Sequence, residues 1–409
     1  MKYTIKILSG LLAVISTPVA LADNFSQLSQ AILENNAEIK AEMQRGRADV
    51  EAAKAENALA QPEVEFEHMW NADEGDNRWS IGISQSFDWP GLYGTRRALA
   101  ADREALATLN RQALELSTRE DIDEALINYI AATKRVEMLR EVSGLLQRLE
   151  TSVRQAFEHG ESTILDVNKA VIESANTTAR LLEAENRQAD ALASLRALGL
   201  DASDSALMSR LETLEFPVSE TRPDEDYDSA LERHPAMLKA EAEIRTARLE
   251  EQLSSKTRLP GFSLGYRHAF EDGKHFNGLS VGLELPIWSR RHSVEASKAN
   301  TLAASISKIS TETSLRAELG RKLVRSVLLC EQIAALAPAV DGTNNMLMLE
   351  KAYKGGQMSL LDYLRECAYF LDARMQLLDL QSEYASVTAA LNAILAGADT
   401  LKCFESILA

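Results

Sequence analysis

The side chains that most often do chemistry are scattered through this chain of 409 residues. The three cysteines, Cys330, Cys367 and Cys403, are odd in number and far apart. That pattern suits neither a disulfide framework nor a metal site, and we interpret Cys330 and Cys367 as small buried helix residues. The histidines lack the His-x-x-x-His spacing of a zinc-binding helix; they are His68, His159, His234, His268, His275 and His292.

The sequence also lacks a Gly-rich phosphate loop and a nucleophile elbow. Carboxylates are abundant, with 61 Asp and Glu against 44 Lys and Arg, but their helical spacing is typical of solvated faces rather than of an acid–base pair. The net charge of −17 excludes nucleic acid as a partner, because phosphate recognition needs a basic surface. We therefore predict no enzyme, no cofactor and no resident metal ion.

One group of carboxylates is arranged differently, at every second residue. Glu63, Glu65 and Glu67 alternate with apolar side chains, which places the three carboxylates on one face of a β-strand. Four segments show this period of two, and the first three carry aromatic side chains on their apolar face; they cover residues 63–70, 79–87, 262–268 and 279–285. The opposite, polar face carries Glu63, Glu65, Glu67, Arg267 and Glu284.

This alternation is typical of membrane-barrel strands, although a soluble antiparallel sheet with one buried face would show it too. In lipid, four strands cannot close a barrel, and open strand edges are not tolerated. About eight strands are the minimum, so the membrane interpretation requires two or more chains. Three chains would contribute twelve strands. The polar turns at residues 71–77 and 271–277 would then lie outside the cell.

The strands belong to a unit that occurs twice in the chain, since residues 155–166 parallel residues 351–362 at an offset of 196. Each copy predicts a helix, two strands, a very long helix and a return helix. The first helices cover residues 26–58 and 225–256, after the capping residues Ser26 and Asp224, the long helices cover 97–157 and 291–354, and the return helices end near Gly199 and Gly397.

Each long helix of about 60 residues would be on the order of 90 Å long, so it must pack lengthwise in coiled-coil fashion. Pro338 and Gly342 are expected to interrupt the second one. At the N-terminus, two lysines, a short apolar run and the pattern Ala20-Leu21-Ala22 predict an export signal over residues 1–22. No other segment is a long unbroken apolar run, so we expect no transmembrane helix.

This order of elements resembles the outer membrane efflux protein (TolC) family over residues 25–397. The most specific motifs are Phe157-x-x-Gly160 followed by Leu165-Asp166, and Tyr353-x-x-Gly356 followed by Leu361-Asp362. Residues 85–97 are most similar to the heavy-metal branch, the CzcC-like channels. The resemblance implies a mainly α-helical trimer with a small membrane β-barrel portion. Its twelve-stranded outer-membrane barrel, four strands per chain, would continue into a long periplasmic α-helical barrel.

The resemblance also implies domains and sites. The two structural repeats would cover residues 23–215 and 216–400, followed by a tail at 401–409. Asp362, and less clearly its first-copy equivalent Asp166, match an acid that lines the closed periplasmic aperture. Arg365 departs from the familiar pattern of two acids, and it is placed to pair with Asp362. The alternative is that Asp362 only caps its helix.

The hairpin tips would dock a periplasmic adaptor, a membrane fusion protein; their residues are Gly160, Glu161, Ser162, Gly356, Gln357 and Met358. The resemblance therefore predicts the exit duct of a tripartite efflux system with an inner-membrane RND-type pump, carrying heavy-metal cations. Rings of lumen carboxylates would favour cations, or they would only solvate a pore wall. The alternatives are a duct for drugs or secreted polypeptides, and a periplasmic coiled-coil adaptor or structural protein.

Overall fold

The computed structural model describes residues 18–70, 78–217, 227–271, 273–285, 291–341 and 345–408. Within these ranges the chain is mostly helical and has one four-stranded sheet. In chain order the elements are α1 (Pro18–Asn35), α2 (Ala37–Glu56), β1 (Glu63–Met69), β2 (Arg78–Phe87), α3 (Pro90–Glu158), α4 (Ile164–Leu198), α5 (Ser205–Glu212), α6 (Tyr227–Glu232), α7 (Pro235–Lys256), β3 (Gly261–Glu271), β4 (Lys274–Glu284), α8 (Arg291–Asp341), α9 (Asn345–Lys354) and α10 (Leu360–Leu408).

The chain forms two compact units, and each unit draws on both halves of the sequence. The first unit combines Met1–Ala37, Ser117–Glu225 and Leu319–Ala393. The second combines Glu38–Leu116, Asp226–Glu318 and Ile394–Ala409. The sequence repeats therefore do not coincide with the compact units, because the long helices α3 and α8 contribute to both.

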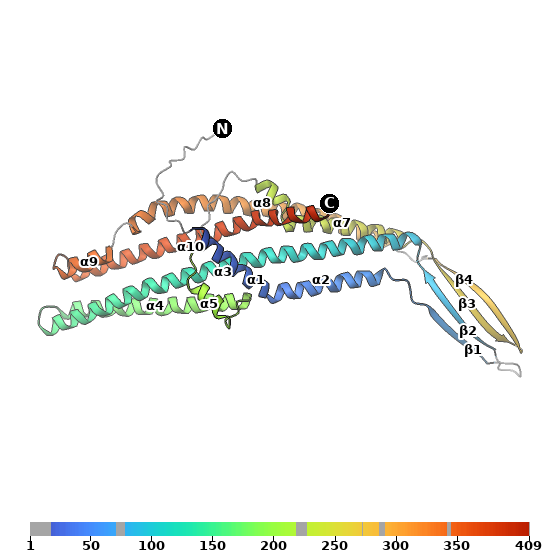
Figure 1. Cartoon of the computed structure of the whole chain (residues 1–409), viewed down its shortest axis with the longest axis horizontal. Helices are drawn as coiled ribbons and strands as arrows, with labels where there is room; N and C mark the ends of the chain where they lie inside the picture. Colours follow the sequence, from blue (N-terminus) through green and yellow to red (C-terminus); the bar gives the residue numbers. More distant parts are fainter. Residues whose placement is uncertain are drawn as a thin grey trace, which may run out of the picture. The chain divides into compact units, whose positions relative to one another are not determined.

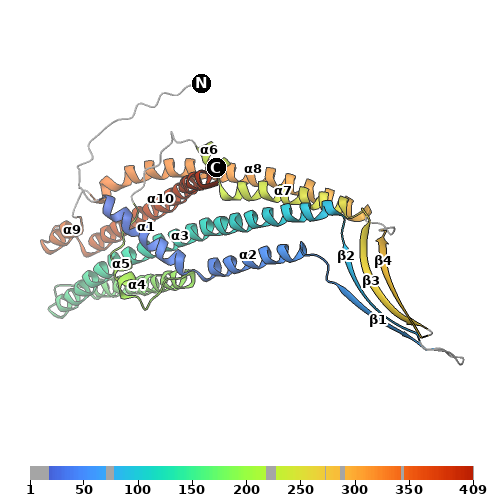
Figure 2. The same ribbon diagram turned by 45° about the vertical axis from the view of Figure 1, so that its right-hand side comes forward.

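The sheet lies in the second unit, and its antiparallel strands follow chain order, β1-β2-β3-β4. Figure 1 shows the four strands side by side, and Figure 2 shows them curving together. One register row crosses the whole sheet, with Ile81 opposite Phe66 and His268, and His268 opposite Asn277. Among the described strands of a single chain, β1 and β4 therefore each have one edge without a partner.

The helices that lead to and from the sheet are tied together by polar contacts. Asp102 of α3 accepts hydrogen bonds from Arg245 Nε at 3.2 Å and from Thr246 Oγ1 at 2.7 Å, both on α7. Lys256, at the end of α7, donates to Thr95 Oγ1 of α3 at 2.6 Å. These contacts fix the start of β3, which follows α7, relative to the end of β2, which precedes α3.

The first unit is built from long helices that bury residues at coiled-coil spacing. On α4 the buried positions include Val167, Ala170, Ser174, Thr177 and Ala184, which are three, four or seven residues apart. The same spacing recurs on α3, where Leu139, Val142, Leu146, Leu149 and Val153 are buried. An average period of 3.5 residues is that of helices packed lengthwise, and coiled-coil packing stays a prediction.

Some predicted boundaries are wrong. The expected helix over 26–58 is divided at Asn36, whose side-chain amide donates to the carbonyl of Leu198 at 2.8 Å. Ser26 therefore lies inside α1 rather than at its start. Gly199, with φ at +123°, ends α4 beside this break, and an added Cβ would lie only 2.8 Å from the Ile32 carbonyl oxygen. The close approach of the two backbones explains the break better than any local helix signal.

The second copy shows comparable corrections. The helix predicted over 225–256 is two helices, α6 and α7, with His234 as the N-cap of α7 and Pro235 as its first residue. Asn277 lies within β4 instead of in the turn. The return helix α10 continues through Gly397 to Leu408, so the expected tail at 401–408 is helical. Asp224, Gly342 and the turn at 71–77 lie outside the described residues.

Helix α8 bears on two further expectations. Among the described residues it is the one helix long and apolar enough, by length and composition alone, to cross a membrane. Its Arg325 forms a two-bond ion pair with Glu383 of α10, at 2.6 Å for each bond, which favours lengthwise helix packing over a membrane span. Cys330 is exposed on α8, because Ser326 and Leu329 occupy the buried phase of the helix. Cys367 is buried as expected.

Candidate functional site

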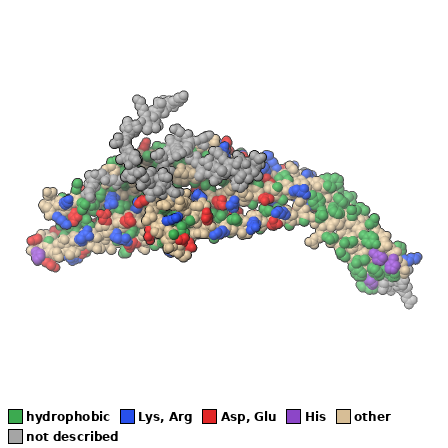
Figure 3. All heavy atoms as spheres, in the orientation of Figure 1, with side chains coloured by type: hydrophobic (Ala, Val, Ile, Leu, Met, Phe, Trp, Pro, Cys, Tyr) green, Lys and Arg blue, Asp and Glu red, His purple; other side chains and the backbone are tan. Residues whose placement is uncertain are grey.

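One face of the sheet exposes apolar side chains along all four strands. The exposed fractions are 67% for Phe66, 51% for Ile83, 51% for Leu264 and 86% for Leu279. Figure 3 shows hydrophobic side chains covering the face of the strands that it presents, with histidines among them. An apolar surface of this extent marks a membrane or protein contact rather than a solvated sheet. The soluble alternative, a sheet with its apolar face buried, does not match these exposures.

The opposite face of the sheet is lined with glycine and serine. Gly265 lies opposite Ser280 and Ser84, while Gly282 lies opposite Ser263. A Cβ at Gly265 would come within 3.0 Å of the Ile83 carbonyl oxygen and 3.2 Å of the Ser84 Cβ. Small residues therefore predominate on this polar face, and a few long side chains carry its charge.

Three of these long side chains form one ion-pair group. Arg267 of β3 extends across Gly82 of β2 to β1, where Nη2 lies 2.7 Å from Glu65 Oε2 and Nη1 lies 3.4 Å from Glu67 Oε2. Glu67 also accepts from Ser80 Oγ at 3.4 Å. The structure thus brings together three of the five predicted polar-face residues, and the single positive charge of Arg267 is shared between two carboxylates.

The other two carboxylates lie outside this ion-pair group. Glu63 begins β1 and Glu284 ends β4, opposite Gly261. Within the described residues neither has a basic partner. The polar face therefore carries one ion-pair group around Arg267 and two further carboxylates, Glu63 and Glu284, that have no basic partner among the described residues.

The two helical hairpins of the first unit turn in the same way. Gly160 and Gly356 have φ values of +78° and +69°, in the left-handed region where glycine is favoured. In each turn the next residue donates back to the helix: Glu161 N–H to the Ala156 carbonyl at 2.8 Å, and Gln357 N–H to the Ala352 carbonyl at 2.9 Å. This pattern satisfies the last carbonyls of a helix. Glu161 and Gln357 are exposed, whereas Met358 is half-buried.

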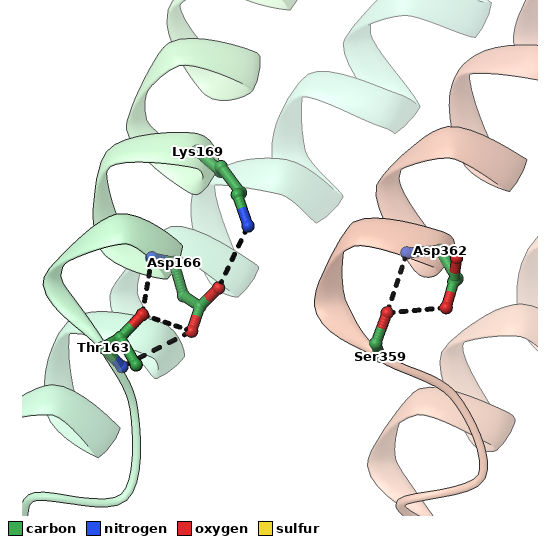
Figure 4. A network of polar contacts seen from close by, with 5 residues as sticks. All are labelled: Thr163, Asp166, Lys169, Ser359 and Asp362. Atoms are coloured by element: carbon green, nitrogen blue, oxygen red, sulfur yellow. Dashed lines mark hydrogen bonds and ion pairs between the residues drawn. The ribbon is translucent and has the colours of Figure 1, made fainter.

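The return helices then begin with matching capping groups, which Figure 4 shows together. Thr163 Oγ1 accepts from the Asp166 N–H at 3.2 Å and donates to its carboxylate at 2.7 Å. Ser359 and Asp362 make the same two hydrogen bonds, at 3.2 Å and 2.6 Å. A basic residue follows each acid at i+3, Lys169 at 3.4 Å and Arg365 at 3.9 Å from the carboxylate.

Arg365 is therefore the second-copy counterpart of Lys169, at the same offset of 196 that relates the two hairpins. The predicted pair of Asp362 and Arg365 is present, although its 3.9 Å separation is long for an ion pair. Sequence reasoning missed Thr163 and Ser359. The signal was available, because Ser or Thr three residues before an acid and ahead of an apolar run is the pattern of a capping box.

The acid of the first hairpin lies close to the aromatic residues of the second. Tyr353 stacks on Tyr363 with ring centroids 5.0 Å apart. The pKa of Tyr353 is raised, first by burial and then by the negative charge of Asp166. The pKa of Cys367 is raised to about 11, mainly because the thiol is buried, so it remains protonated and unreactive.

Comparison with known proteins explains this combination of a two-faced sheet and paired hairpins. Residues 227–397 match the family model described as "Outer membrane efflux protein". Over this segment the chain is similar to the outer membrane efflux protein family. Outer membrane protein TolC of Vibrio cholerae serotype O1 is 21% identical over 394 residues, which cover 89% of this chain and 88% of that protein.

Solved structures of outer membrane channels share the fold. The CmeC outer membrane channel of Campylobacter jejuni superposes with a TM-score of 0.79 at 16% identity, over 97% of this chain and 94% of that chain. The open MtrE outer membrane channel of Neisseria gonorrhoeae has a TM-score of 0.69 at 17% identity, with 94% of each chain covered. These likenesses show the fold that the chain shares with the two channels.

The capping group at Asp166 predicts an acid-sensitive helix start. Its pKa is lowered, first by the hydrogen bond from the Thr163 hydroxyl and further by Lys169. A lowered folded pKa means that the carboxylate stabilises the fold above its ordinary value of 3.8 and loses that effect as pH falls below it. Hydrogen exchange of the first turn of α4, corrected for intrinsic rates, should therefore accelerate on acidification from pH 5 to pH 3.

Asp166→Asn should remove this acid dependence, and Thr163→Ala should weaken the turn by about 1 kcal/mol already at neutral pH. Asp362→Asn is the matched control, since it changes the other cap and should leave exchange in α4 unaltered. An acid dependence that persists in Asp166→Asn would show that another group controls this turn.

Proposed function

We propose that three copies of the chain close a twelve-stranded barrel in the outer membrane, which serves as the exit duct of a tripartite efflux system. The supporting observation is the sheet itself, which has a continuous exposed apolar face and two edges without strand partners. Lipid offers no hydrogen-bond partner to a strand edge, so β1 of one copy would pair with β4 of the next. The long helices would then form the periplasmic part of the duct.

The trimer predicts heat-dependent migration in gel electrophoresis. Unheated outer-membrane extracts should give a band near three times the mass of the 45.0 kDa chain, which collapses to one chain after boiling. Leu279→Lys should abolish the slow band, because a lysine on the lipid face costs about 2–4 kcal/mol at the bilayer centre. Gly278→Lys is the matched control, since this neighbour points to the polar face and has open space around it.

A chain that stays monomeric, or that carbonate releases from the membrane fraction, would contradict the trimeric barrel. Equal loss of the slow band in both lysine variants would contradict the proposed assignment of the two faces.

We also propose that the partners are a periplasmic adaptor and an inner-membrane RND-type pump, and that the cargo is a heavy-metal cation. The adaptor would dock on the exposed hairpin tips around Gly160, Glu161 and Ser162, and around Gly356, Gln357 and Met358. Apolar side chains are exposed beside the first tip, with Ile164 at 52% and Leu165 at 65%. Support for a metal cargo comes from the resemblance of residues 85–97 to the heavy-metal branch.

Deletion of the gene tests the cargo, provided that the strain has no redundant channel. Tolerance to zinc, cobalt and cadmium should fall, and tolerance to drugs should not change. Unchanged metal tolerance would reject the metal assignment, and a selective loss of drug tolerance would favour the alternative duct for drugs.

The charges on the polar face would tune ion selectivity once this face lines a lumen. Arg267→Gln would leave Glu65 and Glu67 uncompensated in each chain. In planar bilayers, the reversal potential in a salt gradient should therefore shift toward that of an ideal cation-selective pore. Arg45→Gln is the control, because it removes the same charge from an exposed position on α2 outside the sheet. No shift in Arg267→Gln would mean that this wall only solvates the lumen.

The same recordings address the proposed aperture at Asp362, Arg365 and Asp166. If the ionised carboxylate of Asp362 holds the aperture closed, Asp362→Asn should increase conductance. Ser359→Ala should not, because it weakens the helix cap but keeps the charge. Equal effects of the two variants would mean that Asp362 acts only as a capping residue.

A further inference from the structure

We propose that His268 and His275 form a binding site for a first-row transition-metal ion, such as Zn²⁺ or Cu²⁺, on the outward face of the sheet. The two residues lie on adjacent strands, β3 and β4, near the hairpin that joins them. They are diagonal neighbours on the same face, because His268 is opposite Asn277 and His275 is opposite Phe270. Figure 3 shows histidines gathered in this part of the strands.

The hydrogen bonds of His268 prepare one nitrogen for a metal. Asn277 Oδ1 lies 2.7 Å from His268 Nδ1 and also accepts from the Tyr266 hydroxyl at 2.8 Å. An amide oxygen only accepts, so His268 Nδ1 carries the proton and Nε2 presents a lone pair. A metal-binding histidine nearly always donates its other N–H to an oxygen in this way, which fixes the tautomer and the ring.

The second nitrogen lies at a suitable distance. His275 Nδ1 is 3.3 Å from His268 Nε2. Two nitrogens that bind one tetrahedral zinc ion at about 2.0–2.1 Å are themselves about 3.4 Å apart. His275 is exposed and can turn about its side-chain bonds to direct its lone pair to the shared point, whereas His268 is held by Asn277. The two rings are now stacked at an interplanar angle of 22° and hydrogen-bonded through these nitrogens, so a turn of the His275 ring is what would let both nitrogens bind one ion.

Aromatic neighbours support both imidazole rings. Trp79 lies against His268 with ring centroids 5.7 Å apart, and Phe270 lies against His275 at 5.1 Å. Farther along β4 the outward positions become Leu279, Val281 and Leu283. The pair thus lies at one end of the apolar band, where a barrel meets water and where ions have access.

The described residues do not include three or more possible ligands in one group. The chain therefore supplies two nitrogen ligands, and water would complete the coordination of the ion. Imidazole ligands without carboxylates favour zinc, copper and nickel over magnesium or calcium. The site is separate from the polar face, because the side chains of His268 and Arg267 alternate across the strand.

Titration of the purified full-length protein in detergent with Zn²⁺ tests the site by calorimetry. Wild-type protein should bind one ion per chain, and His268→Ala and His275→Ala should each weaken binding at least tenfold. Asn277→Leu should weaken zinc binding by about tenfold or more, because it removes the hydrogen bond from His268 Nδ1 to Asn277 Oδ1 without removing a ligand. With Cu²⁺, the electron paramagnetic resonance spectrum should show coupling to two nitrogens, and to one after either histidine is removed.

His159→Ala, in the turn after α3, is the control and should leave zinc binding unchanged. His68→Ala should also have no effect, because His68 contacts Trp70 rather than the pair. Zinc binding that survives the loss of both His268 and His275, in protein whose circular dichroism is that of wild type, would overturn the proposal. A loss in His68→Ala as large as in His275→Ala would overturn the two-ligand assignment.

Discussion

Backbone hydrogen bonding at the edges of the sheet is the constraint on which the architecture depends. A strand in lipid must find a partner for every N–H and carbonyl group, and water is not there to provide one. The four described strands pair with one another inside the sheet, but the outer edge of β1 and the outer edge of β4 have no strand partner. The proposed trimer follows from this deficit. Because side chains alternate across each strand, the alternation of apolar and polar residues gives the sheet one apolar face and one polar face.

The helices face a different requirement, since they need lengthwise partners along their whole extent. Buried residues at coiled-coil spacing on α3 and α4 provide it, and many are small, such as Ala170 and Ala184, so that backbones approach closely. The turns between these helices are satisfied locally, by Gly160 and Gly356 and by the capping groups that follow. The hairpin tips can therefore be well defined although they are exposed.

Local patterns in the sequence predicted the sheet, the long helices and the glycine turns, because each depends on residues close together in the chain. Features that depend on tertiary contacts were missed. The break at Asn36 arises from its bond to the end of α4, far away in sequence. Cys330 was assigned to the core because of its residue type, but the phase of α8 is set by packing partners. The pairing of Arg267 with Glu65 and Glu67 required the order of strands, which composition does not reveal.

Gly82 has no side chain, and the side chain of Arg267 crosses over it on the way from β3 to β1. An added Cβ would be 3.7 Å from Arg267 Nε, an ordinary contact, so alanine fits, but a longer side chain would occupy the path of the guanidinium group. Arginine would then swing away from β1. A large uncharged side chain at position 82 would thus separate Glu65 and Glu67 from their basic partner. The charge of the polar face therefore depends partly on a residue that carries no charge.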